Sequence, residues 1–136
     1  MPTSAAANHE IKQQYINGHF CYAYKFGILT NGLGIVRSID FYNKDYLNSH
    51  PEIVIEKKSK SPDEDKSLAD SKALIPTLKD FKERHPLINP KIFLGDAVFD
   101  TIEIYKSLFE DFEFQKAFIP LKVKLPTMKF VCPKMK

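Results

Sequence analysis

The sequence predicts an α/β fold whose sheet is partly antiparallel and partly parallel. Three observations support this prediction: an aromatic and β-branched hairpin near the start of the chain, two later stretches with helical spacing, and a short apolar run between them. The implied order is hairpin, loop, helix, strand, helix and strand, which is typical of a mixed sheet with flanking helices. Because a chain of 136 residues leaves little room for two domains, we expect residues 1–136 to form a single domain.

The predicted hairpin comprises residues 18–30 and residues 33–42, joined by the dipeptide Asn31-Gly32. Its residues are largely aromatic, aliphatic and β-branched, which suits extended strands, and an Asn-Gly dipeptide tolerates the positive φ of a tight turn. Alternate residues of the second strand share one mainly apolar face, namely Leu33, Ile35, Arg37, Ile39 and Phe41. We expect this face to pack against the core.

Residues 56–66 follow as a stretch of charges of both signs, with one proline and no large apolar side chain. Burial cannot offset the entropy of ordering such a segment, so we interpret it as a mobile charged loop at the surface. A phosphate-contacting arm is the alternative. The mixed sign of the charges favours the solvated loop.

A first helix is predicted in the stretch that ends at Pro86. Residues that can share one face recur there at steps of three and four: Ser71, Leu74, Leu78, Phe81 and His85. Ser67 and Asp70 form a possible capping pair. Pro76 would cost about 3 kcal/mol in a helix interior, so we expect the regular helix to begin just before it or to bend there.

A strand and a second helix follow. Residues 91–94, KIFL, form an apolar run too short for a helix and flanked by turn residues, which predicts a strand buried on both faces. The helix is predicted to begin at Thr101, with Asp100 and Glu103 as its capping pair. Its apolar positions are Ile102, Tyr105, Leu108, Phe109 and Phe112.

The end of the chain predicts one more strand and a tail. Residues 117–121, AFIPL, suit a short strand, and Pro120 places it at a sheet edge or at a strand end because proline cannot donate a backbone hydrogen bond. Residues 122–136 are rich in lysine and proline, and we expect them to be a frayed C-terminal tail.

Composition limits the functional classes only weakly. The net charge of +3 and the pI near 8.8 are compatible with a phosphate-rich partner but are common in proteins without one. Cys21 and Cys132 lie outside any paired Cys or Cys/His motif, so we expect no disulfide and no zinc site. No stretch approaches the roughly 18 apolar residues of a membrane helix and no secretory leader is visible, which favours a cytoplasmic location.

Asp96 is the main candidate for chemistry. It closely follows the predicted strand 91–94, and open α/β sheets place ligands beyond the carboxyl ends of their strands. A carboxylate at that point can bind a hard cation such as Mg²⁺. A hydrogen-bonding turn residue or a helix-start anion is the alternative for Asp96. Asp100 is already accounted for as a helix cap.

Other catalytic and binding motifs do not occur. The four histidines form no i,i+4 pair and have no neighbouring cysteine, so no familiar metal motif is present; they are His9, His19, His50 and His85. The chain has neither a Gly-x-Ser-x-Gly elbow nor a glycine-rich phosphate loop. Hydrolase and nucleotide-binding functions therefore lose most of their support.

Four segments in the same order resemble the DDE-domain transposases of bacterial insertion sequences. They are NGHFCYAYKFGILTNGLGIVRSIDFYN (residues 17–43), DSKALIPTLKDFKERHP (70–86), NPKIFLGDAVFD (89–100) and KAFIPL (116–121). The resemblance covers most of the chain and implies a ribonuclease H-like fold, a mixed sheet with flanking helices. It also implies that three acidic residues hold two Mg²⁺ ions for attack on a phosphodiester, and Asp96 in GDAVFD matches the second of these acids.

The resemblance also implies that the domain is incomplete. The family's first aspartate lies on a strand before the hairpin, whereas residues 1–17 contain no aspartate, and the closing glutamate would fall on a helix beyond Lys136. Without that first strand, two sheet edges between the hairpin and the strand before Asp96 are expected to be exposed. We expect one acid alone to give no strand cleavage. Met1 in family-like sequence suggests a reading frame left by truncation of a longer gene.

Two functional hypotheses follow from the sequence. The first is a transposase fragment whose parent cleaves and joins DNA at element ends. The second is a non-catalytic regulator that binds DNA or the full-length transposase, or that self-associates through exposed strand edges. In either case Lys25, Arg37, Lys91 and the lysines of residues 116–136 are candidate DNA contacts, although such residues are usually only solubilising.

Overall fold

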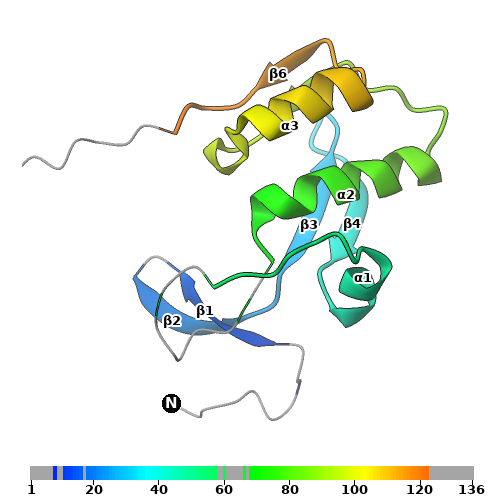
Figure 1. Ribbon diagram of the computed structural model, residues 1–136. Helices are drawn as coiled ribbons and strands as arrows, with labels where there is room; N and C mark the ends of the chain where they lie inside the picture. The colour runs from blue at the N-terminus through cyan, green and yellow to red at the C-terminus, as the bar shows by residue number, and fades with distance from the viewer. Residues whose placement is uncertain are drawn as a thin grey trace, which may run out of the picture.

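The computed structural model describes residue 8 and residues 11–16, 18–57, 60, 66 and 68–122 (Figure 1). The elements in chain order are β1 (Lys12–Ile16), β2 (His19–Ala23), β3 (Phe26–Thr30), β4 (Val36–Phe41), α1 (Lys44–Ser49), α2 (Asp70–Arg84), β5 (Ile92–Leu94), the 3₁₀ turn η1 (Ala97–Phe99), α3 (Ile102–Lys106), the π-helical turn η2 (Ser107–Asp111) and β6 (Lys116–Phe118). The protein is therefore a mixed α/β structure, as the sequence predicts.

The strands of the described part pair two by two into small sheets. β1 and β2 are antiparallel, β3 and β4 are antiparallel, and β5 and β6 are parallel. The described strands form no larger sheet. Both antiparallel and parallel pairing occur, but in separate pairs held together by helices.

The predicted strand 18–30 is in fact two strands. It breaks at Tyr24 and Lys25, so that β2 pairs with β1 and only β3 pairs with β4. Gly18 takes a φ of 83° between β1 and β2, a conformation that glycine adopts at no steric cost. β1 itself was not predicted, because its polar residues show no apolar alternation.

The turn of the β3–β4 hairpin is longer than the Asn31-Gly32 dipeptide predicts. The side chain of Asn31 accepts hydrogen bonds from the backbone N–H groups of Leu33 and Ile35, each at 3.0 Å. The positive φ falls on Gly34, at 78°. The register shifts between Leu29 and Thr30, so that Thr30 lies opposite Val36.

The face of the hairpin that packs inward is not the predicted one. Leu29 packs against the core and Ser38 is buried, so the inner face carries small and polar side chains from β4. Ile39 and Phe41, which were expected to be inside, are about half exposed. The outer face is instead the apolar one, and it consists of Phe26, Ile28, Val36, Ile39 and Phe41.

Helix α2 is the central element of the fold (Figure 1). It begins at Asp70, well before Pro76, and includes that proline in its interior, so of the two predicted alternatives a start just before Pro76 was wrong, and a bend at Pro76 stays a prediction. Ala69 precedes it without a side-chain cap, and Ser67 lies outside the described residues. The helix buries Ala73, Leu74, Thr77, Leu78 and Phe81, and ends before Pro86 as predicted.

The main apolar core joins α2 to the second half of the chain. It consists of Leu74, Leu78, Phe93, Ile104, Leu108, Phe114 and Ile119. A smaller cluster of Tyr46, Leu68 and Ala73 joins α1 to the other side of α2. Both clusters therefore depend on α2.

Helix α3 buries a face that matches the predicted one in part: Leu108 is in the core and Tyr105 and Phe112 pack against it as predicted, whereas Ile102 and Phe109 are exposed. Its cap is Thr101, whose hydroxyl accepts a hydrogen bond from the backbone N–H of Ile104 at 3.3 Å, and not Asp100. Ile104 and Leu108 are 2% and 1% exposed, whereas Ile102 is 77% exposed. The helix continues into the π-helical turn η2. A π turn holds more residues than an α-helical turn, so the residues after it are rotated around the helix axis.

Both remaining strand predictions are confirmed in position, but the prediction that the strand at residues 91–94 is buried on both faces was wrong, because Phe93 is buried while Ile92 and Leu94 are exposed. β5 occupies three of the residues 91–94, and β6 overlaps the start of residues 117–121, with Pro120 beyond its end. Most of the predicted loop 56–66 and of the predicted tail 122–136 lies outside the described residues. Within the described part, no helix is both long and apolar enough to cross a membrane.

Ile104 and Ile102 provide a matched test of the face that α3 buries. Replacement of the buried Ile104 by Ala should lower the free energy of unfolding by about 2–5 kcal/mol, because it removes core contacts and leaves a cavity. Ile102→Ala, on the exposed face of the same helix, should change it by no more than about 0.5 kcal/mol. Urea denaturation followed by circular dichroism measures both. Equal losses would contradict the described packing.

Candidate functional site

Asp96 lies at the carboxyl end of β5, where the sequence places it. Gly95 separates it from the strand, and a side chain at that glycine would collide with the rings of Phe93 and Phe99. The carboxylate of Asp96 accepts a hydrogen bond from the backbone N–H of Ala97 at 2.6 Å and caps the turn η1. Through this hydrogen bond Asp96 acts as the anion at a helix start, which is the alternative to metal binding that the sequence leaves open.

The described residues do not provide a metal site around Asp96. Among them, no group of three or more His, Cys, Asp or Glu residues lies close enough to hold a metal ion. Asp100, the nearest acid in sequence, accepts a hydrogen bond from the backbone N–H of Lys122 at 2.8 Å. A pair of Mg²⁺ ions needs several carboxylates, so the residues described here do not fit the cofactor that the family resemblance implies.

The three candidate DNA contacts lie in different surroundings. The ammonium group of Lys25 donates hydrogen bonds to the carbonyl of Leu68 at 2.7 Å and to the carboxylate of Asp70 at 3.2 Å. Arg37 lines a groove between β3 and β5. Lys91 is exposed just before β5. Lys25 thus has a structural role at the start of α2, and DNA contact by any of the three stays a prediction.

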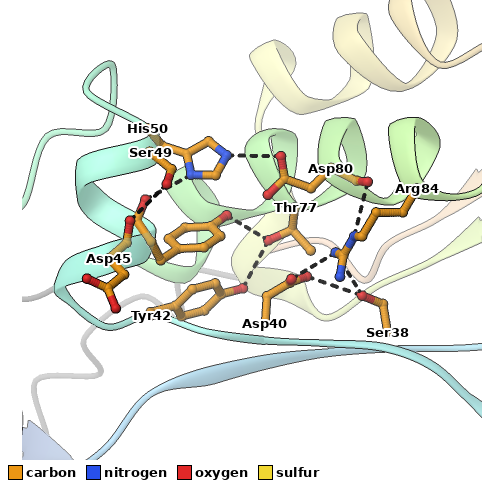
Figure 2. Close-up of polar contacts among 10 residues, drawn as sticks. Ser38, Asp40, Tyr42, Asp45, Ser49, His50, Thr77, Asp80 and Arg84 are labelled. Atoms are coloured by element: carbon orange, nitrogen blue, oxygen red, sulfur yellow. Dashed lines mark hydrogen bonds and ion pairs between the residues drawn. The ribbon is translucent and has the colours of Figure 1, made fainter.

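A dense set of polar contacts lies where β4, α1 and α2 meet (Figure 2). At its centre Thr77, 3% exposed, shares hydrogen bonds with the phenol groups of Tyr42 at 3.3 Å and Tyr46 at 3.1 Å. Burial raises the pKa of Tyr46 to about 12, although its contact with Thr77 acts in the opposite direction. The phenols therefore stay protonated at ordinary pH and can donate hydrogen bonds.

Space for Tyr42 comes from a glycine on the neighbouring strand. The phenol of Tyr42 lies over Gly27, where any side chain would collide with it. Gly27 pairs with Asp40 across the hairpin. The ring of Tyr42 therefore passes over β3 next to the polar contacts that Asp40 makes. The absence of a side chain at Gly27 allows Tyr42 to reach Thr77.

Arg84 closes the same region from the end of α2. Its Nη2 donates to the carboxylate of Asp40 at 2.8 Å and to the hydroxyl of Ser38 at 3.0 Å, and its Nε donates to the backbone carbonyl of Asp80 at 3.2 Å (Figure 2). The side chain of Asp40 is only 10% exposed. A buried carboxylate needs such a partner, which explains why the polar face of β4 turns toward α2.

His50 connects α1 to α2. Its Nδ1 contacts the backbone carbonyl of Tyr46 at 2.9 Å, and its Nε2 contacts the carboxylate of Asp80 at 3.1 Å. Both partners are hydrogen-bond acceptors, so the doubly protonated ring satisfies both. Burial acts to lower the pKa of His50, but the carbonyl of Tyr46 and the carboxylate of Asp80 outweigh it, and the pKa is raised.

These polar contacts stabilise the fold and are poorly suited to catalysis. Both ring nitrogens of His50 are engaged, so neither can accept a proton from a substrate in this arrangement. Sequence reasoning missed the cluster because its members lie 30 to 46 positions apart. Asn43, whose side chain caps α1 through the backbone N–H of Tyr46, was the one local signal for that helix.

A groove between β3 and β5 is one concave surface of the described residues. It has a volume of about 750 Å³. β3 forms one wall of the groove and β5 forms the other. The residues that line it are Ile28, Leu29, Thr30, Asn31, Gly32, Arg37, Leu78, Phe81, Ile88, Pro90, Ile92, Phe93, Leu94 and Phe114. Asp96 follows the β5 wall after Gly95.

Comparisons of this chain with protein-family models, with curated proteins and with solved structures find no match. The function must therefore be inferred from the residues and the geometry of the chain itself. The two features that bear on it are the carboxylate of Asp96 at the end of β5 and the groove along that strand.

The contact between His50 and Asp80 predicts a dependence of stability on pH. Because folding raises the pKa of His50 above its ordinary 6.5, its stabilisation is complete below that value and is lost as pH rises through the folded pKa. The free energy of unfolding, measured with urea at about pH 5.5 and about pH 8.5, should therefore fall more in the wild type than in His50→Gln. His85→Gln is the matched control. An unchanged pH profile in His50→Gln would contradict this role.

Thr77 provides a second test of the polar cluster. Thr77→Val keeps the shape of the side chain but leaves the phenols of Tyr42 and Tyr46 without their shared partner, and it should cost about 1–3 kcal/mol of unfolding free energy. Thr77→Ser keeps the hydroxyl and should lose only the contribution of one methyl, about 0.8 kcal/mol. If the valine variant proved as stable as the wild type, the hydroxyl would not be holding α1 and the hairpin to α2.

Proposed function

We propose that this chain is part of the catalytic domain of an insertion-sequence transposase, with a ribonuclease H-like fold that is incomplete. The observation that carries the proposal is the groove that separates the β3–β4 hairpin from the parallel pair β5–β6, with Asp96 at the end of β5. The family resemblance implies a strand at this position, between the hairpin and the strand that carries the second acid.

The exposed apolar surface supports the same proposal. On the hairpin the outward side chains include Ile28 and Phe41, and on β5 they are Ile92 and Leu94; all four are exposed. A sheet face of this composition is normally covered by another layer of structure. The resemblance implies further helices in the complete domain, including the one that carries the closing glutamate, and such helices would cover this face.

The chemistry of the proposed parent needs more acids than the described residues supply. Bound Mg²⁺ ions would activate water or a DNA 3′-hydroxyl for attack on a phosphodiester. In this chain, Asp96 offers a carboxylate that the backbone N–H of Ala97 orients beyond the end of β5. With that one acid, the chain can position part of a site but cannot enclose the ions.

A non-catalytic role as a DNA-binding or transposase-binding regulator is the alternative. The specific observation that favours it is the pair of open strand edges beside the groove, which can bind a polypeptide without any metal. In this alternative Asp96 is only the cap of the η1 turn.

The proposal predicts that the chain alone does not cut DNA. Supercoiled plasmid incubated with the purified protein and Mg²⁺ should show no nicking above that of a buffer control, because one carboxylate does not fix two ions in line with a phosphate. Gel electrophoresis of the plasmid measures this. Sustained nicking that Asp96→Asn abolishes and Asp100→Asn preserves would show a complete site and contradict the proposal.

The ancestry has an independent test. The coding DNA on either side should contain an in-frame strand segment with an aspartate upstream and a helix segment with a glutamate downstream, even if a stop codon or frameshift interrupts them. Flanking DNA without either segment would contradict descent from a DDE transposase, whatever the nicking assay shows.

A further inference from the structure

We propose that a pocket between the β1–β2 pair and α1 binds a small phosphate monoester that carries hydroxyl groups. The pocket has a volume of about 240 Å³ and shares no lining residue with the groove beside β5. Two independent observations carry the proposal: the charge of the lining, and one buried hydrogen-bond acceptor that has no donor. Neither observation depends on the ancestry proposed above.

The lining of this pocket is positively charged. Among the described residues it includes Lys12, Lys25, Lys44 and Lys66, and it contains no acidic side chain. Lys25 is already paired with Asp70. Lys12 and Lys44 are exposed, and their ammonium groups form no ion pair within the described part of the chain. Uncompensated ammonium groups around one pocket attract a multiply charged anion.

Gln14 provides the buried acceptor. It lies in the middle of β1, on the strand face that also carries Lys12, and it lines the pocket although it is only 3% exposed. Its side-chain oxygen Oε1 is buried and accepts no hydrogen bond within the described structure. Buried acceptors are nearly always paired in native proteins. An unpaired one in the wall of a pocket therefore indicates a donor that a ligand brings.

The other walls suit the body of a small polar molecule. Tyr42 and Asn43 already use their side-chain oxygen atoms in contacts within the fold, so they do not replace Gln14 as acceptor. Leu47 and Leu68 add apolar contact area. Sites for drug-sized ligands have volumes of about 300–1,000 Å³. A pocket of about 240 Å³ is smaller and fits a ligand of the size of a small metabolite.

A hydroxylated phosphate monoester satisfies both observations. Its phosphate carries a charge of about −1.5 to −2 at neutral pH, and lysine is a common phosphate ligand in proteins. The phosphate dianion has no proton to donate, so the hydroxyl groups of the ligand are the donors for Oε1 of Gln14. A carboxylate brings only one charge. Lys12 and Lys44 thus bind the phosphate, and Gln14 orients the hydroxylated body.

Isothermal titration calorimetry of the full chain at about pH 8 and low salt tests the proposal, with D-glucose 6-phosphate as the probe. Methyl phosphate keeps the anion but has no hydroxyl group, and it should bind about ten-fold more weakly, because the hydrogen bond to Gln14 is lost. Uncharged glucose should not bind. Addition of NaCl to about 1 M should weaken the binding of both phosphates, because salt screens the lysines.

Substitutions separate the roles of the two kinds of residue. Gln14→Met keeps the length of the side chain and removes the acceptor, so it should weaken glucose 6-phosphate about ten-fold and leave methyl phosphate unchanged. Lys12→Gln and Lys44→Gln should each weaken both probes. Lys91→Gln, an exposed lysine outside the pocket, is the matched control and should change neither. Circular dichroism shows whether each variant is folded. Gln14→Glu, a second variant at this position, should repel both probes.

Four results would overturn the proposal. They are the absence of saturable binding at millimolar glucose 6-phosphate, unchanged affinity in folded Gln14→Met, tighter binding of gluconate, and displacement of the probe by a lower concentration of a short DNA duplex. The second would show that a bound water pairs with Oε1, the third that the site takes carboxylates, and the fourth that the pocket belongs to a DNA-binding surface. These titrations contain no metal and measure no cleavage, so their failure leaves the nicking and flanking-DNA tests of the proposed function unaffected.

Discussion

The described structure depends on one constraint: the β3–β4 and β5–β6 pairs are joined through α2 and not by backbone hydrogen bonds. Leu74 and Leu78 on one side of the helix belong to the core with β5 and α3, while Ala73 belongs to the cluster with α1. Thr77 joins the helix to the hairpin and to α1 by polar contacts. A single helix therefore substitutes for the continuous ladder of hydrogen bonds that holds an ordinary sheet together.

This constraint explains why the sheet faces are distributed as they are. The hairpin turns its polar side toward α2, because the buried carboxylate of Asp40 needs the guanidinium of Arg84 as its partner. The apolar side is left outward, and the edges of β3 and β5 stay open. Natural proteins usually protect such edges, and an open pair beside an apolar groove indicates a surface made to be covered.

Local patterns predicted most of the elements, although not β1 or α1, and they did not predict which elements pack together. The apolar spacing around Leu78 indicated α2, the KIFL run indicated β5, and the position of Asp96 after that strand followed from the turn residues. The packed face of the hairpin was predicted wrongly, because alternation shows which residues share a face and cannot show which face a helix will cover. No local sequence pattern could predict the contact of His50 with Asp80, because it forms only when α1 packs against α2.

Asp96 and the groove adjoin each other at β5. Ligand sites in open α/β sheets form where the carboxyl ends of neighbouring strands meet, and β5 has β6 on one side only. A strand bound along the other edge of β5 in the parallel sense would end beside Asp96 and could place a second side chain next to that carboxylate. Under the proposed transposase ancestry, the strand that satisfies the backbone of Ile92 and Leu94 would also determine what surrounds Asp96.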